Sequence, residues 1–280
     1  MSRATRRLRG HLIVALLGVA VVIAVLPLVL ILGTLVVKGA SSLDWAFFTQ
    51  IPAPAGETGG GVANGIVGTL IIVGIAGLIA VPVGVGAGLY VAEYPGTTLA
   101  WVARFVADVM NGTPSIVIGV FAWATVVATQ KHFSALAGSL ALAMLMLPMI
   151  LRTTEEMIKL VPHSLREAAL ALGYPRWRTA LSVVVRTILP GIVTGCLLAI
   201  ARAAGETAPL LFTALGSQFF SVNIGQPMAA LPLVIYGYAT GPYEEWHRLA
   251  WAAALVLILV VFALSVSARL ATRRRTDGRH

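Results

Sequence analysis

Long apolar stretches without charge constrain this chain more than any other feature. The first, residues 12–37, has 26 residues and contains no Asp, Glu, Lys or Arg. About 20 such residues cross the ~30 Å hydrocarbon core of a bilayer as an α-helix, and a lone span must be helical because lipid cannot satisfy backbone polar groups. The fold expected is an all-α polytopic membrane protein with six transmembrane helices. These are predicted at 12–37, 64–92, 110–130, 133–151, 187–210 and 249–268.

Composition agrees with a membrane protein, since 58% of residues are hydrophobic and 11% are charged, against about 25% charged in soluble domains. A shorter apolar piece, Met228 to Tyr238, contains Pro232 and is predicted to be re-entrant or interfacial because it is too short to span. Residues 12–37 exceed the roughly 7–15 residues of a signal-peptide core, so they are predicted to stay as the first span. Cys196, inside an apolar span, is interpreted as a packing residue.

Positive residues gather at the two ends of the chain and in one loop. Sixteen of the twenty Lys and Arg residues fall on the side of the amino end, which predicts that both termini and the loop 152–186 are cytoplasmic. The expected organisation is a basic end at 1–11, a six-span domain at 12–268 and a basic tail at 269–280 that contacts anionic lipid. The net charge of +9 does not indicate nucleic-acid binding, because it follows membrane topology.

The loop contains a short helix with clear start and stop signals. Ser164 and Glu167 have the spacing of a capping box, in which each side chain binds an orphan amide of the first turn. Ala168 and Ala169 favour helix, and Gly173 suits the position just after a helix end. On these mechanics alone, the loop is either a linker between spans or a surface that a cytoplasmic protein contacts.

An opposed charge pair, Arg202 and Glu206, lies in the fifth apolar stretch. Residues four apart share one face of a helix, and an unpaired Arg at membrane depth costs about 2.5–3.5 kcal/mol. One interpretation is a structural ion pair. The other is an anion site that continues to Thr207, because guanidinium suits phosphate oxygens and a carboxylate can accept from the P–OH that phosphate carries and sulfate lacks.

A weaker signal precedes the third apolar stretch, where Asn111, Thr113 and Ser115 surround Pro114. This composition predicts a helix start with a capping side chain. Free amides at such a start can bind an anion, although an ordinary cap is the simpler interpretation.

Several of these motifs resemble one family, the permease subunits of ABC importers. Glu167-Ala168-Ala169, followed three residues later by Gly173, is similar to the family's EAA motif. The stretch from Arg202 to Ala214 resembles the phosphate permeases of the PstA family more closely than those of the PstC family. The family pattern continues with a proline where this chain has Arg186, and Pro190 comes four residues later, which puts the junction of the loop with the fifth span in question.

The resemblance implies a bacterial inner-membrane permease subunit that imports inorganic phosphate and couples to an ATPase through Glu167, Ala168, Ala169 and Gly173. It also implies three partners: a PstC-like second permease, a dimeric PstB-like ATPase and an external PstS-like phosphate-binding protein. ATP and Mg would be bound by the ATPase, since this sequence has no P-loop motif. No cofactor or metal site is expected in this chain.

Three alternatives remain open from the residues. A permease for another oxyanion or an amino acid would not require Arg202 and Glu206. A channel or secondary carrier would work without an ATPase. An intramembrane enzyme is disfavoured, because the spans contain no Ser/His, paired Asp or metal-ligand constellation.

Overall fold

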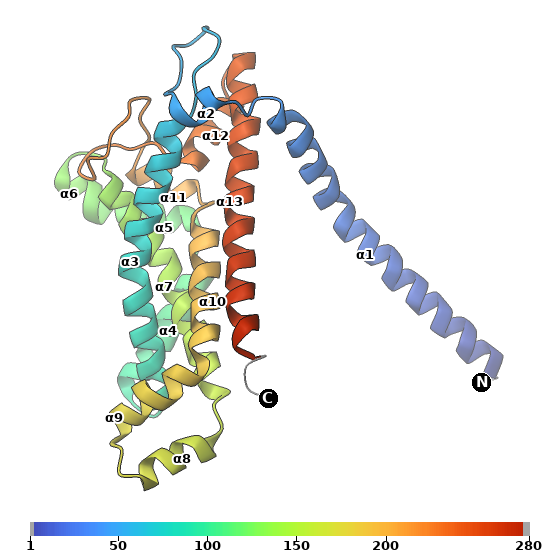
Figure 1. The fold of residues 1–280 in the computed structure, drawn as a ribbon, viewed down its shortest axis with the longest axis vertical. Helices are drawn as coiled ribbons and strands as arrows, with labels where there is room; N and C mark the ends of the chain where they lie inside the picture. The colour runs from blue at the N-terminus through green and yellow to red at the C-terminus, as the bar shows by residue number, and fades with distance from the viewer. Residues whose placement is uncertain (1–2, 277–280) are drawn as a thin grey trace.

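Two long helices, α3 (Ala63–Glu93) and α7 (Ala135–Lys159), pack against each other along the centre of the molecule. The computed structural model describes the backbone of residues 3–276 and the side chains of residues 10–267 and 270. Figure 1 shows α10 (Val185–Ala203) and α13 (Glu244–Thr276) beside this pair. No strand occurs between residues 3 and 276, as expected for an all-α protein.

Glycine allows the close approach of α3 and α7. A Cβ added at Gly84 would lie 2.9 Å from the Ile150 Cβ, and one added at Gly88 would lie 2.6 Å from the Leu151 carbonyl oxygen. Small residues at four-residue spacing are the usual means of close helix packing in membranes. Cys196, which is 7% exposed, belongs to the same apolar core, as expected for a packing residue.

Five helices within the described backbone are long and apolar enough to cross a membrane. The fifth predicted span differs most in its bounds, since one helical stretch runs over Arg176–Ala203. It consists of α9 (Arg176–Thr179), the π-helical turn η2 (Ala180–Val184) and α10. The helix therefore begins earlier and ends earlier than the predicted 187–210, because residues 204–207 form a turn.

The remaining predicted span, 110–130, is wrong at its start. Its residues belong to a bent pair of helices, α4 (Thr98–Gly112) and α5 (Ser115–Ala122), which turns by 109° at Thr113–Pro114 and continues through η1 (Trp123–Val127) and α6 (Ala128–Gln130). Counting the pair as one broken span gives six. The sequence pattern missed α4 because that helix is amphipathic, with Arg104 and Asp108 directed at α7.

Short elements close the two ends of the bundle. At one end, called here the α12 end, lie α2 (Trp45–Thr49), α11 (Ala208–Thr213) and α12 (Leu231–Ala239). Pro232 sits in the first turn of α12 instead of breaking it, and nine residues are too few to span. At the opposite end, the α8 end, α8 (His163–Ala171) lies below the bundle (Figure 1).

Helix α1 (Arg3–Ala40) leaves the bundle at the α12 end and diverges from it (Figure 1). Among residues 10–40, only Leu35 and Gly39 are buried, and Gly39 lies against Trp251 and Leu255 of α13. The start of α1 and the end of α13 both lie toward the α8 end. The predicted tail 269–280 begins as helix, and its residues 277–280 lie outside the described part of the chain.

Candidate functional site

The Arg202–Glu206 pair lies where α10 ends. Arg202 is in the last turn of α10, whereas Glu206 follows in a turn closed by the bonds Gly205 N–H to Arg202 O and Glu206 N–H to Ala203 O, both 3.1 Å. The two residues therefore do not share one helical face, and that prediction is wrong. Their charged groups still meet, with 3.9 Å between Arg202 Nε and Glu206 Oε1, which is an ion pair and too long for a hydrogen bond.

The two charges differ in exposure. The Arg202 side chain is 67% exposed and that of Glu206 is 21% exposed. The recess beside them, lined by apolar Leu145, Met146 and Ala199, has a volume of about 10 Å³, roughly the room of one water molecule. This chain alone therefore does not enclose an anion; it presents a guanidinium, with a carboxylate behind it, at an open surface.

Thr207 and the earlier cap candidates lie in or near breaks between helices. Thr207 is the half-buried residue before α11, and its side chain makes no capping bond. A helix does begin at Ser115, as predicted, but Pro114 occupies the cap position without a side-chain bond. Asn111 belongs to α4, and Thr113 Oγ1 donates back to the Val109 carbonyl at 2.7 Å. The predicted capping side chain is therefore wrong, because these residues complete the preceding helix.

Helix α8 shows a well-defined end and an unexpected start. Its carboxyl end is closed by Gly173 N–H to Leu170 O at 2.9 Å and Tyr174 N–H to Ala169 O at 3.2 Å, the paired bonds of a Schellman motif. Gly173 has φ +83°, which confirms the prediction for that glycine. The capping box is wrong, however: α8 begins at His163 after Pro162, which leaves Ser164 inside the first turn.

The EAA residues of α8 divide between two faces. Ala169 is buried against the bundle, whereas Glu167 and Ala168 are exposed. Three large apolar side chains around them, Leu165, Leu170 and Leu172, are also exposed. Helix α8 therefore exposes one carboxylate together with apolar side chains.

A buried carboxylate that sequence reasoning missed connects the helices near α8. Glu155 of α7 is 1% exposed and accepts from Arg104 Nε of α4 at 2.8 Å, Arg152 Nη1 at 2.9 Å and Lys159 Nζ at 3.1 Å. Arg152 also pairs with Asp108 of α4. The available signal was the spacing of Arg152, Glu155 and Lys159, three and four residues apart on one helix face.

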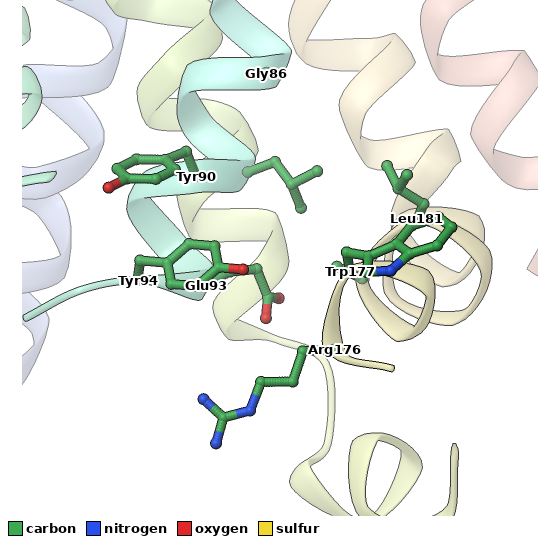
Figure 2. Close-up of a pocket in the computed structure, with 9 residues that line it drawn as sticks. Gly86, Tyr90, Glu93, Tyr94, Arg176, Trp177 and Leu181 are labelled. Atoms are coloured by element: carbon green, nitrogen blue, oxygen red, sulfur yellow. The ribbon is translucent and has the colours of Figure 1, made fainter. Parts of the chain in front are cut away.

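A second ion pair connects α8 to the end of α3. Arg166 Nη1 donates to Glu93 Oε1 at 2.6 Å, and Arg166 Nη2 donates to the Ile158 carbonyl at 3.3 Å. Beside the pair is a cavity of about 220 Å³ between α3 and α9. Figure 2 shows Tyr90, Glu93 and Tyr94 on one side of this cavity and Trp177 on the other.

Comparison with known proteins agrees with this architecture. The family described as "Binding-protein-dependent transport system inner membrane component" matches residues 84–277. The Yersinia pestis protein named phosphate transport system permease protein PstA is 45% identical over 270 residues, covering 96% of this chain and 92% of that protein. PstA of Haemophilus influenzae is 45% identical, covering 95% and 94%, and PstA 1 of Mycobacterium tuberculosis H37Rv is 38% identical, covering 96% and 91%. The chain belongs to the PstA family of permeases.

Solved structures extend the comparison to the fold. The inward-facing MetNI methionine ABC transporter has a chain with a TM-score of 0.63 at 18% identity, covering 76% of this chain and 94% of that one. An amino acid ABC transporter crystallised with histidines gives 0.54 at 19% identity, covering 76% and 92%. This PstA-family chain therefore has the ABC permease fold. It is a multi-pass inner-membrane subunit of an ABC importer and works in a complex with other subunits.

Proposed function

We propose that this permease imports inorganic phosphate and that Arg202, with Glu206 and Thr207, contacts the anion on its path. The single observation that carries the proposal is the exposed guanidinium of Arg202, held 3.9 Å from a carboxylate at the broken end of a span. A charge within a membrane span is costly unless it faces protein or water. The 38–45% identity to proteins named phosphate permeases supports phosphate as the anion.

The openness of the Arg202 site supports a second, PstC-like permease chain as the other wall of the path. Inorganic phosphate at neutral pH carries a P–OH group, for which Glu206 supplies an acceptor, while guanidinium supplies donors to the remaining oxygens. Ser115, at the start of α5 in the broken span, is a further candidate for contact with the anion through backbone amides.

Coupling to ATP is assigned in this proposal to α8. The exposed Glu167 and Ala168, together with the apolar side chains beside them, form the surface on which a PstB-like ATPase dimer would dock. ATP and Mg bind that partner. An external PstS-like protein would deliver phosphate at the α12 end, and both termini would be cytoplasmic, because the positive residues gather there.

The test is phosphate uptake by the complete transporter in cells that lack other high-affinity uptake. We expect Arg202→Gln to abolish uptake and Arg202→Lys to retain a part of it, because ammonium supplies charge without the planar fork. Arg248→Gln is the matched control, since Arg248 is likewise an exposed arginine that pairs with a nearby glutamate. Glu206→Gln should reduce preference for phosphate over sulfate. Unchanged uptake in Arg202→Gln, with the complex assembled, would refute the role of Arg202.

A further inference from the structure

Helix α8 is attached to the bundle through few groups, and one arginine supplies its polar connection. Arg166 reaches two helices at once, the Glu93 carboxylate at the end of α3 and the Ile158 carbonyl near the end of α7. Since α7 leads into α8 through Leu160–Pro162, its connection to α8 is also covalent. The connection to α3, by contrast, depends on side chains.

The contact between α3 and the α8–α9 segment is otherwise loose. Within residues 10–267, no hydrogen bond other than Arg166–Glu93 joins α8 to α3. The 220 Å³ cavity beside the pair separates the side chains of Tyr90 in α3 and of Tyr94 just after it from Trp177 of α9 (Figure 2). Because side chains across a cavity do not pack directly against each other, the ion pair is the direct polar contact between α8 and α3.

Partial burial makes this pair stronger than a surface salt bridge. The side chains of Arg166 and Glu93 are 21% and 18% exposed, and the Nη1–Oε1 distance is 2.6 Å. Short charge-assisted bonds between partly desolvated groups are among the stronger polar contacts in proteins, whereas exposed pairs contribute little.

The far end of α3 is bound to the loop between α11 and α12 and to the start of α12. Asn64 Nδ2 donates to the Ser217 carbonyl at 2.8 Å, and Thr69 Oγ1 accepts from Leu231 N–H at 2.7 Å. The 31 residues of α3, with Pro82 among them, make one continuous helix of about 46 Å. A displacement of Glu93 would therefore be carried along α3 to the opposite end of the molecule.

We propose that the Arg166–Glu93 ion pair is a positioning contact that transmits movement of α8 to α3, and through α3 to the loop at the α12 end. This inference rests on the proposed docking of an ATPase at α8. It assigns to Glu93 and Arg166 a role separate from the docking surface, because both side chains face the bundle while Glu167 is exposed.

The experiment measures ATP hydrolysed and phosphate imported by the complete transporter in proteoliposomes. Glu93→Gln and Arg166→Gln should each lower import about tenfold, as expected for loss of about 1.4 kcal/mol of coupling, while ATP hydrolysis falls less. The ATP used per phosphate therefore rises. A merely structural role would lower both rates together through loss of assembled complex and leave this ratio unchanged.

The decisive comparison is between single charge reversals and a double variant in which the ion pair is restored with its charges exchanged. The double variant Glu93→Arg/Arg166→Glu should recover import relative to either single reversal, and Arg166→Lys should keep most of the wild-type ratio. Glu156→Gln is the matched control, since Glu156 is an exposed carboxylate at the same end that pairs with Lys159. If the charge-reversed proteins do not assemble, the ratio measured for Glu93→Gln and Arg166→Lys decides.

The outcomes separate this inference from the proposed function. Wild-type transporter that imports no phosphate, or that imports it without ATP, contradicts the proposed function itself. Wild-type import with ATP, together with an unchanged ATP-to-phosphate ratio in Glu93→Gln and Arg166→Gln, overturns the role of the ion pair alone.

Discussion

Replacement of Glu155 by Gln should destabilise the α8 end of the bundle far more than its position near a helix terminus suggests. The carboxylate is 1% exposed and accepts from Arg104, Arg152 and Lys159. Removing one partner of a buried ion pair costs about 3–5 kcal/mol. The three cations are 25%, 28% and 51% exposed, so each regains some water, and we expect a loss of about 3 kcal/mol, at the lower end of that range.

The assay is thermal unfolding of the purified transporter in detergent, followed by intrinsic fluorescence. At about 2 °C per kcal/mol for a chain of this size, Glu155→Gln should lower the Tm by about 6 °C. Glu156→Gln makes the same chemical change one residue away at a side chain that is 61% exposed, and it should lower the Tm by about 2 °C or less. Equal, small shifts in the two variants would refute the reasoning that burial makes the Glu155 network important.

Three further predictions concern backbone and loop contacts. Gly68→Ala should destabilise the chain by about 2 kcal/mol by forcing α3 away from the Ala229 carbonyl, whereas Gly74→Ala, with open space at its Cβ, should be neutral; the Tm of each variant checks this. Gly173→Ala should cost about 1 kcal/mol because φ is +83° there, and co-purification of the ATPase with the permease should fall; unchanged recovery would show that the end of α8 is not needed for docking. Asn64→Ala removes the hydrogen bond to the Ser217 carbonyl. Loss of about 0.65 kcal/mol of local stability makes the open form of the 214–230 loop three times more populated, so its proteolysis should rise at least threefold; equal cleavage rates would contradict this.

Much of the fold follows from the sequence because apolar length and composition are strong signals. Residues 64–92 and 133–151 fall close to α3 and α7, since uninterrupted apolar runs leave little choice but a helix. The predicted boundary at 110 failed because Arg104 and Asp108 interrupt the apolar pattern of α4. Those charges are neutralised by Glu155 and Arg152 of α7, a tertiary contact that periodicity within one segment does not reveal.

The sequence indicated several of the residues at the candidate sites, but not where the helices that hold them begin and end. Gly173 was predictable because a positive φ after a helix favours glycine. The capping role of Ser164 was not, because Pro162, with φ −57°, already fits the start of a helix. Likewise Glu206 sits in a turn because α10 ends at Ala203. Arg166–Glu93 was missed because its partners are 73 residues apart.

The burial of Cys196 has a practical consequence for measuring motion in this protein. Cys196, at 7% exposure, lies in the core, and it is the chain's single cysteine. Thiol reagents added from water therefore have little access to the native chain. A cysteine introduced at an exposed position such as Leu172, which is 78% exposed, would be the site that a fluorophore or spin label modifies. The wild-type sequence thus serves as its own background for spectroscopy of α8 during the transport cycle.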